Sequence, residues 1–517
     1  MILGFSNTAK HKAHQYISTS VYQYMELKIT NSLSGNKEIF KPIIPGRIGM
    51  YVCGPTVYND VHLGNCRTFV NFDMIYRFLV YSGYKVRYVR NITDVGHLLD
   101  DGEDRMLKGA RLEQLEPMEV AQKYSNGFHD MMRIFNTIPP SIEPRASGHV
   151  PEQIEMVQAI LDNGYGYIKN GSVYFDTVKF AKTTDAYGKL SGRVLDDLLT
   201  ETRDLNKQDE KNHPSDFAIW IKASPEHIMR WNSPWSEGFP GWHLECSAMS
   251  TKYLGKTFDI HGGGNDLKFP HHENEVAQNM GSCKCQPANY WMHANMLLLN
   301  GTKMSKSLGN TISPEELFTG NSEHISKGYS PMVIRFFFLQ AHYTSPLNIT
   351  DDALQAAEKG YRRLMEGIKI LNGLAGLGAE QAGALDAEVL QLLDQVSEDM
   401  NDDFNVPKAM SRIFELVTKV NALKGGQLSL QDISNATLAR MLQTISDYVF
   451  QVFGLADEMA GDKGADVLDG LMRLVIDIRQ DARVRKDWPT SDKVRDTLAA
   501  LKIQLKDGKD GTEWSVG

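Results

Sequence analysis

Residues 49–65 read Gly49-Met-Tyr-Val-Cys53-Gly-Pro55-Thr-Val-Tyr-Asn-Asp-Val-His62-Leu-Gly-Asn65, and this segment is the strongest indication of the fold class. Its apolar start predicts a short buried strand over 49–53 that ends at Gly54-Pro55. Apolar residues at helical spacing predict a helix over 68–81, and alternation predicts a second strand over 85–92. A strand, a helix and a strand in this order form a βαβ unit. We therefore expect an α/β fold with a parallel sheet.

The segment His62-Leu-Gly64-Asn65 follows the first predicted strand, at the edge of the sheet where ligands of parallel sheets bind. Gly64 allows a nucleotide to approach the backbone closely, and the start of the next helix offers N–H groups to phosphates. His62 can donate a hydrogen bond to a phosphate oxygen as charge develops. A surface turn that contains a histidine is the alternative, and four residues alone do not exclude it.

A second segment, Lys303-Met-Ser-Lys306-Ser307, lies between Gly301 and Gly309. Two lysines and two hydroxyls on a glycine-bounded loop can close on a triphosphate, neutralise its charge and release pyrophosphate. The alternative is a solvated basic loop, which the His62 motif upstream makes weak. The two segments together predict a nucleotide site.

Four dispersed residues carry side chains that zinc prefers, namely Cys53, Cys246, His271 and Glu275. The run from Pro270 to Glu275 is typical of a helix start, which places His271 and Glu275 on one face. His272 would then point about 100° away from that face. Spacing alone leaves open a buried cysteine pair and a histidine at a helix start, without a metal.

Two further clusters are weaker signals. Gly262-Gly-Gly264-Asn-Asp266 follows a strand predicted over 256–261 and suits close approach to an adenosine, although glycine clusters also simply turn a chain. Another strand is predicted over 289–297. Cys283-Lys-Cys285 has no second cysteine pair nearby, so we expect a surface loop there and assign it no role.

The charge of the chain is unevenly distributed. A net charge of −9 argues against binding of polyanions by the whole surface. Residues 471–517, however, contain ten lysines and arginines against eight aspartates and glutamates, which favours RNA contact near the C-terminus. Trp488 and Trp514 are candidates there for stacking on unpaired bases. Packing into a small core is the alternative that we favour for each of them singly.

The sequence also bears on location. Five cysteines without a paired framework fit a reducing compartment. The first 20 residues lack the apolar core of a signal peptide, and no run approaches the ~18 apolar residues that span a bilayer. We therefore expect a cytoplasmic protein without a membrane partner, and we expect a monomer.

Taken together, these motifs resemble the cysteinyl-tRNA synthetases, which belong to the class I aminoacyl-tRNA synthetases. The resemblance runs from about Met25 to the C-terminus. Besides the motifs above, it includes 216–220, 240–249, 402–405 and 511–514. Asn65 departs from the signature, which has histidine at that position, but it still supplies hydrogen-bond donors.

The resemblance implies one Zn²⁺ per chain, bound by Cys53, Cys246, His271 and Glu275, with His271 chosen over His272. It implies that Trp242 and Cys53 both line the pocket for the substrate cysteine. It implies ATP contacts, with Mg²⁺, by His62, Gly64, Asn65, Gly264, Asp266, Lys303 and Lys306, of which His62, Asn65, Lys303 and Lys306 are catalytic.

The reaction that the resemblance implies has two steps. The carboxylate of L-cysteine attacks the α-phosphate of ATP to give cysteinyl-adenylate, and a hydroxyl at the 3′ end of tRNA(Cys) then attacks the carbonyl. Zinc would select cysteine by binding its thiolate, since a serine hydroxyl is a poor ligand. Shape alone separates such similar substrates only about 10–200-fold.

The expected architecture is a Rossmann-like parallel-sheet catalytic domain with an insertion, an α-helical bundle domain and a small C-terminal domain. Helices are predicted over 354–368, 388–400, 408–423 and 437–453, and a linker over 461–470. The expected segments are 1–24 as a disordered N-terminal extension, 25–150 as the first half of the catalytic domain, 151–240 as the insertion, 241–350 as the second half with the lysine-serine loop, 351–460 as a helical tRNA- and anticodon-binding domain, and 461–517 as a small anticodon-recognition domain.

Two other functions remain open at this point. A cysteine ligase that acts on the amine of an amino sugar would share both nucleotide motifs and the zinc ligands, but it would not need the residues after Thr350. A non-catalytic protein that binds zinc and RNA would have no use for Lys303 and Lys306. Exchange of pyrophosphate into ATP with cysteine would separate the second alternative from either enzyme.

Overall fold

A computed structural model describes residues 26–95, 115–193, 211–225, 227–304, 309–458, 463–501, 503–508 and 511–516. The extension expected at 1–24 lies outside these ranges, as does Lys306. The chain divides into two compact units, Met1–Leu455 and Ala456–Gly517, and each is described by itself.

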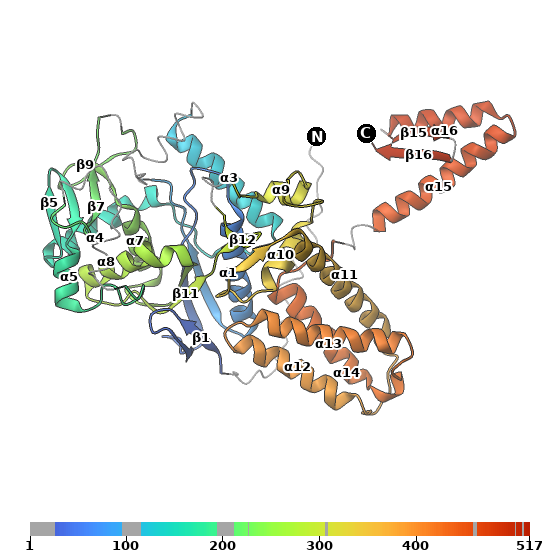
Figure 1. Cartoon of the computed structure of the whole chain (residues 1–517), viewed down its shortest axis with the longest axis horizontal. Coiled ribbons are helices and arrows are strands. Elements are labelled where there is room, and N and C mark those ends of the chain that lie inside the picture. The colour runs from blue at the N-terminus through green and yellow to red at the C-terminus, as the bar shows by residue number, and fades with distance from the viewer. Residues whose placement is uncertain are drawn as a thin grey trace. The chain divides into compact units, whose positions relative to one another are not determined.

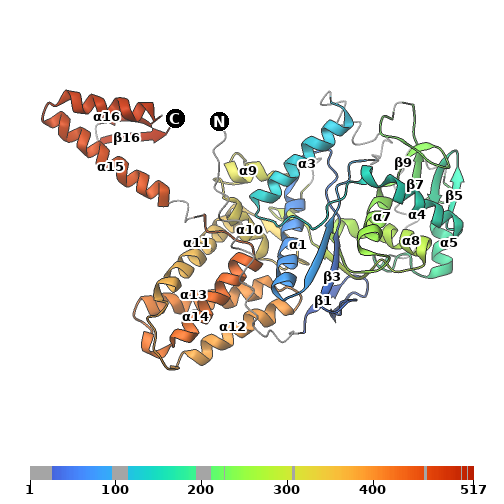
Figure 2. The same cartoon turned by 180° about the vertical axis from the view of Figure 1, so that it is seen from behind.

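The centre of the first unit is a parallel sheet (Figures 1 and 2). Its strands lie in the order β11 (Ala288–Ala294), β10 (Phe258–Gly264), β3 (Arg47–Val52) and β4 (Lys85–Arg90). The registers of all three pairs are parallel. The predicted α/β fold and the strands expected over 49–53, 85–92, 256–261 and 289–297 are thereby confirmed, with shifted ends.

Successive side chains of β3 point to opposite faces of the sheet. The side chains on both faces are buried, so helices pack on both faces. Met50 and Val52 share a core cluster with residues of α1 (Leu63–Tyr81). Tyr51 lies in another cluster with Met249 of α7 (Trp242–Leu254). Other helices described in this region are α3 (Pro117–Ile134), the π-helical turn η4 (Lys268–His272) and α8 (Glu273–Cys283), with short 3-10 turns η1 (Ala146–His149) and η3 (Asn265–Leu267).

The helix predicted over 68–81 begins earlier, at Leu63. His62 is its N-cap, and the imidazole Nδ1 accepts a hydrogen bond from Asn65 N at 3.3 Å. The expected loop at Gly64 and Asn65 is therefore the first helical turn. An N-cap side chain that satisfies one free N–H explains why the helix can start there.

An antiparallel sheet and two helices form the region expected as an insertion (Figure 2). The sheet order is β5 (Gly166–Lys169), β6 (Ser172–Phe175), β7 (Phe217–Lys222), β9 (Glu237–Pro240) and β8 (Trp231–Asn232). With α4 (Val150–Asp162) and α5 (Thr177–Thr184) it encloses a core of its own around Phe175 and Trp220.

A small sheet follows the central one. Its strands lie in the order β13 (Thr302–Lys303), β12 (Leu297–Leu299) and β14 (Leu347–Ile349), and β12 and β14 run parallel. Between β13 and β14 lie α9 (Pro314–Thr319) and α10 (Pro331–Leu339). Near the start of the described chain, β1 (Lys28–Asn31) and β2 (Asn36–Ile39) form a hairpin.

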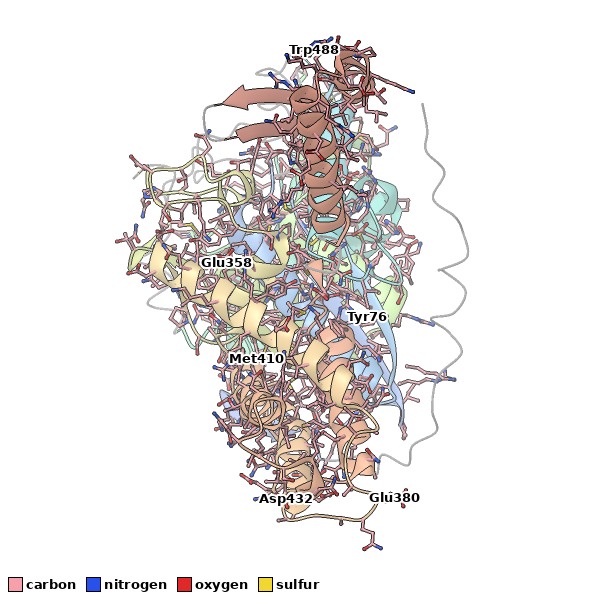
Figure 3. The ribbon with its side chains drawn as sticks, turned by 90° about the vertical axis from the view of Figure 1, so that its right-hand side faces the viewer. Tyr76, Glu358, Glu380, Met410, Asp432 and Trp488 are labelled. Carbon is pink, nitrogen blue, oxygen red and sulfur yellow. A yellow bond between two sulfur atoms is a disulfide. The ribbon has the colours of Figure 1, made fainter. Side chains whose placement is uncertain are left out.

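The helical prediction after Asp351 is confirmed (Figures 1 and 3). The helices are α11 (Asp351–Leu374), α12 (Asp386–Asn401), α13 (Val406–Lys424) and α14 (Asn435–Ser446), with a 3-10 turn η6 (Leu430–Asp432) and a π-helical turn η7 (Asp447–Val452). Their core is continuous with that of the central sheet. Phe78 of α1, for example, meets Phe404 edge to face, with ring centroids 5.8 Å apart.

The second unit contains α15 (Lys463–Val484), α16 (Trp488–Ala500) and an antiparallel pair, β15 (Ile503–Gly508) and β16 (Gly511–Val516). The linker expected over 461–470 is wrong from Lys463 onward, because α15 begins there. Trp488, labelled in Figure 3, is 56% exposed, so it does not pack into a core as we favoured. No described helix is both long and apolar enough to cross a membrane.

Candidate active site

The candidate site lies at the carboxyl edge of the central sheet, between β3 and β10. The chain leaves β3 for α1 and β4 on one side, whereas β10 pairs with β3 on the other side. Such a switch in strand order opens a crevice beyond the strand ends, where ligands bind. Cys53 directly follows β3, and its N–H donates to Gly262 O of β10 at 3.0 Å.

Four buried side chains from separate elements converge there. Cys53 Sγ lies 3.6 Å from Cys246 Sγ of α7 and 3.5 Å from Glu275 Oε1 of α8. His271 Nε2 lies 3.2 Å from the same Glu275 oxygen. One donor atom from each of the four lies within 4.8 Å of all the others. The residues proposed from the sequence as metal ligands are therefore together, and His271 and Glu275 face each other as the i, i+4 spacing predicts.

A second, overlapping group shares Cys53 and Glu275 but adds His261 and His272. His272 Nε2 lies 3.3 Å from Cys53 Sγ, so the prediction that His272 points away is wrong. The ideal angle of about 100° per residue does not apply, because Phe269 is extended inside η4 and α8 starts only at Glu273. His261 Nε2 lies 2.9 Å from Glu275 Oε2.

Sequence reasoning missed His261 as a neighbour of the metal donors. It lies in β10, next to glycines that we considered only for adenosine. Its position near the carboxyl end of a predicted strand adjacent to that of Cys53 was the available signal. Its ring stacks on Trp291 with centroids 4.3 Å apart, which fixes the ring that faces Glu275.

The electrostatics of this cluster fit a bound cation. Burial raises the pKa of the Cys53 thiol well above its ordinary value and also raises the pKa of Cys246. Burial lowers the pKa of His243 and His293 to about 3, so both imidazoles are neutral. A cation reverses the effect on thiols, because a coordinating thiol loses its proton. Two thiols, an imidazole and a carboxylate are a donor set that suits Zn²⁺.

Trp242, the first residue of α7, borders these donors. Its ring and the His271 ring have centroids 4.4 Å apart and planes inclined by 37°. Trp242 is half-buried, so it forms part of the wall beside the metal donors, where a small substrate could contact it.

The nucleotide motifs lie at the start of α1 and the end of β10. Gly264 approaches α1 closely, since a Cβ added to it would lie 3.8 Å from Thr68 Oγ1. The same Cβ would lie 2.4 Å from Asp266 Oδ1, so a larger residue would have to displace the Asp266 carboxylate. His62 and Asp266 are exposed, which leaves them accessible to a ligand.

Lys303 lies in β13 and is exposed, whereas Lys306 is outside the described residues. The carbonyl oxygen of Lys303 accepts a hydrogen bond from Asn310 Nδ2 at 3.0 Å. This contact joins the two sides of the lysine-serine segment. The placement of Lys306 relative to the other motifs thus remains a prediction from the sequence.

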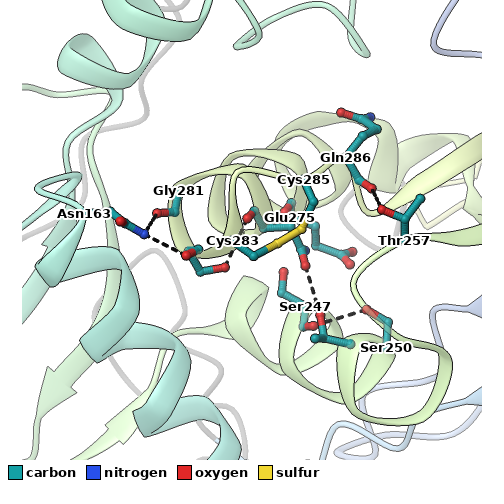
Figure 4. Close-up of a disulfide and its surroundings, with 12 residues drawn as sticks. Asn163, Ser247, Ser250, Thr257, Glu275, Gly281, Cys283, Cys285 and Gln286 are labelled. Carbon is teal, nitrogen blue, oxygen red and sulfur yellow. Dashed lines mark hydrogen bonds between the residues drawn. A yellow bond between two sulfur atoms is a disulfide. The ribbon is translucent and has the colours of Figure 1, made fainter.

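Cys283 and Cys285 form a disulfide at the end of α8, as Figure 4 shows. The sequence predicted a surface loop here and assigned the two cysteines no role; the chain turns directly after Cys283, the last residue of α8, and the two cysteines are paired. Lys284 between them is exposed and has a φ of 58°, which brings the two side chains to the same side of the turn. Both sulfurs are outside the two groups of metal donors described above.

Comparisons with known proteins agree with this geometry. Residues 39–359 match the family described as tRNA synthetases class I (C) catalytic domain, and residues 395–457 match the DALR domain. A cysteine–tRNA ligase of Bacteroides fragilis is 50% identical over 495 residues, which cover 95% of this chain and 99% of that protein. A cysteine–tRNA ligase of Bacteroides thetaiotaomicron has the same identity and coverage.

A solved structure supports the fold. Methionyl-tRNA synthetase of Mycobacterium tuberculosis, in complex with methionyl-adenylate, has a TM-score of 0.54 at 14% identity. The match covers 78% of this chain and 89% of that one. The catalytic-domain match spans more than half of the sequence and the ligase matches span nearly all of it, and so this chain belongs to the cysteine–tRNA ligase family of class I tRNA synthetases.

Proposed function

We propose that this chain activates L-cysteine with ATP to form cysteinyl-adenylate, and then transfers the cysteinyl group to the 3′ end of tRNA(Cys). The observation that carries the proposal is the buried cluster of Cys53, Cys246, His271 and Glu275 at the carboxyl edge of the sheet, where Cys53 follows β3 and His62 caps the next helix along the chain. Sulfur-rich metal donors next to nucleotide motifs suit a substrate that is itself a thiol.

In this proposal the four residues of that cluster hold one Zn²⁺. When bound, zinc would take the thiolate of cysteine as a further ligand, a chemistry that a serine hydroxyl matches poorly. Trp242 would close the pocket from the side of His271. His261 would orient Glu275 through its hydrogen bond to Oε2, as outer partners of metal ligands commonly do.

ATP, with Mg²⁺, would lie across the carboxyl edge of the sheet. Gly264 and Asp266 would contact the adenosine, and Gly64 would let the phosphates approach the start of α1, where free N–H groups favour anions. His62 and Asn65 would donate to the phosphates, together with Lys303 and Lys306. These donors act on charge that develops as the cysteine carboxylate attacks the α-phosphorus.

The transfer step would use the rest of the chain. We assign the helical region 351–460 to tRNA binding and residues 461–517 to the anticodon, within the segments expected from the sequence. Support comes from the match of 395–457 to the DALR domain and from the basic excess after residue 471. The protein would act in the cytoplasm, as a monomer.

Exchange of labelled pyrophosphate into ATP tests the first step. We expect exchange that depends on cysteine and that serine does not support at equal concentration. Cysteine charging of tRNA(Cys) tests the second step. Exchange without charging would favour a cysteine ligase with another acceptor, such as an amino-sugar amine. Absence of exchange from a folded, zinc-loaded chain would contradict both enzymes and favour a binding protein.

A further inference from the structure

Arg67 makes an unusual set of contacts from the start of α1. Its side chain is fully buried. Nη1 donates to Asn295 O at 2.8 Å and to Met296 O at 2.9 Å. Nη2 donates to Ser345 O at 2.6 Å and to His342 O at 3.3 Å. One guanidinium thus binds carbonyl oxygens of two chain segments that are far apart in sequence.

No carboxylate of the described part of the chain forms an ion pair with Arg67. Among the described residues, the hydrogen-bond acceptors of Arg67 are these carbonyl oxygens, and Nε has no partner. Burial lowers the pKa of Arg67 to about 10, so the side chain is still charged at neutral pH. A buried charge is costly, and well-packed apolar residues often replace one without loss of stability. Packing alone therefore does not explain why an arginine occupies this position.

The carbonyl groups that Arg67 binds lie where two strands begin. Met296 directly precedes β12, and Ser345 lies two residues before β14. These strands pair in parallel from Leu297 and Leu347 onward, so both enter the small sheet at the same edge. The backbone of the two segments is also joined there, because Leu347 N donates to Met296 O at 3.2 Å.

The same small sheet carries one nucleotide motif, and α1 carries the other. β12 turns through Gly301 into β13, where Leu298 pairs with Lys303. His62 caps α1, and Asn65 lies two residues before Arg67. The guanidinium therefore links α1, which His62 caps, directly to the small sheet that contains Lys303.

We propose that Arg67 is a positioning residue for adenylate formation, which fixes the small sheet and Lys303 in register with the His62 motif on α1. Its planar fork of donors suits this task, because it can hold two pairs of oxygens at once. Arg67 acts through the groups that contact ATP and does not contact ATP itself. The inference rests on the function proposed above.

Arg335 offers a matched control for the cost of changing a buried arginine. It is also fully buried, and it donates to Phe453 O at 2.7 Å and to Phe135 O at 2.6 Å. Unlike Arg67 it also pairs with a carboxylate, that of Asp73, at 2.5 Å. Asp73 also lies in α1, but none of these partners belongs to β12 or β14, so loss of Arg335 would leave the link between α1 and the small sheet in place.

The test compares Arg67→Lys and Arg67→Ala with Arg335→Lys and Arg335→Ala. Circular dichroism first establishes a temperature at which all variants are folded. At that temperature we expect kcat for cysteine-dependent pyrophosphate exchange to fall about 10- to 100-fold in both Arg67 variants, since misplacement by about 1 Å costs this much. The KM for cysteine and the zinc content of the chain should each stay within about twofold of the wild-type values. The reason is that binding of cysteine in the ground state is retained.

Chemical rescue adds a readout that a purely structural role would not move. Guanidinium ion, at concentrations that leave the wild type folded and active, should restore kcat of Arg67→Ala at least severalfold and leave Arg335→Ala unchanged. Wild-type kcat in Arg67→Lys would overturn the proposal, and so would an equal loss in folded Arg335→Lys. Exchange by the wild type, measured in parallel, tests the proposed function separately, because it involves no change at Arg67.

Discussion

Cys246 joins the metal donors from α7, which makes it the sharpest single-residue test of the zinc site. We expect Cys246→Ala to lower zinc affinity by more than the ~10–100-fold that loss of an outer partner costs. The preference for cysteine over serine in exchange should then fall to the roughly 10–200-fold that shape alone supplies. Atomic absorption after dialysis and exchange with both amino acids measure these effects.

Cys66 is the matched control for this substitution. It is also a fully buried, free cysteine, but it lies within α1 and outside both groups of donors. Cys66→Ala should therefore keep one zinc per chain. A Cys246→Ala chain with full zinc content would show that His261 and His272 complete the site instead.

Lys306 is predicted from the sequence to act on the triphosphate. We expect Lys306→Ala to lower kcat for exchange at least ~100-fold, because a lost donor to developing charge costs about this much. Zinc content and the unfolding temperature should not change. Lys182→Ala, at an exposed position of α5, controls for the loss of a surface charge. Unchanged exchange in Lys306→Ala would remove the residue from the mechanism.

At the scale of elements, Asp386 links two helices of the bundle. Its carboxylate lies in the first turn of α12 and accepts from Ser434 N at 3.0 Å, just before α14. It also accepts from the hydroxyls of Ser434 and Thr437 and from Gly383 N. We expect Asp386→Ala to lower the free energy of unfolding by roughly 2–3 kcal/mol, since hydrogen bonds to a charged group are lost. Urea unfolding measures this effect, and Asp432→Ala, at an exposed side chain, is the control.

The effect of Asp386 depends on pH in a defined direction. Burial alone would raise its pKa, but the hydrogen bonds from Ser434 and Thr437 outweigh burial and lower the pKa from 3.8 to about 2. A carboxyl group with a lower pKa when folded adds stability above its unfolded pKa and loses it as the pH falls. The difference between wild type and Asp386→Ala should therefore be full above pH 4 and shrink as the pH falls from about 4 toward 2. A difference that stays constant over this range would contradict the assigned hydrogen bonds.

The sequence predicted elements better than their ends. Apolar periodicity located α11, α12 and α13 because each buries one face on the shared core. It missed the first turn of α1, whose start depends on the cap at His62 and not on apolar spacing. It also missed the start of α15, because the stretch from Gly461 to Gly470 was interpreted as a linker, although a helix tolerates single glycines at a cost of about 1 kcal/mol each.

The candidate site shows the same limit. Residue types proposed Cys53, Cys246, His271 and Glu275 as metal donors, but spacing alone left other arrangements open, and the family resemblance was needed to single out this set, which the structure brings together. They were not enough to place His272, because the π-helical turn before α8 changes the direction of each side chain. The contacts of Arg67 were also beyond prediction, since its carbonyl partners carry no side-chain signal in the sequence.

At the scale of the whole molecule, the second unit can be separated from catalysis. Residues 456–517 form a compact unit of their own, whereas both groups of metal donors and the described nucleotide motifs lie in the first unit. Exposed Trp488 offers a flat surface for a base, and stacking of this kind is worth about 1–3 kcal/mol per base.

We therefore expect a chain that ends at Gly461 to keep cysteine-dependent exchange within about twofold of the full chain. We expect its kcat/KM for tRNA charging to fall at least ~10-fold, because the loss of one stacked base lowers affinity by about that factor. Because contacts to phosphate release counterions, the advantage of the full chain should shrink as salt rises. Exchange and charging, measured on both chains over a range of salt concentrations, test whether the second unit contributes to tRNA binding. If exchange fell as far as charging, the second unit would support the fold of the catalytic region and would not bind RNA. If charging were unchanged, tRNA recognition would belong to the helices of the first unit, and Trp488 would have no part in it.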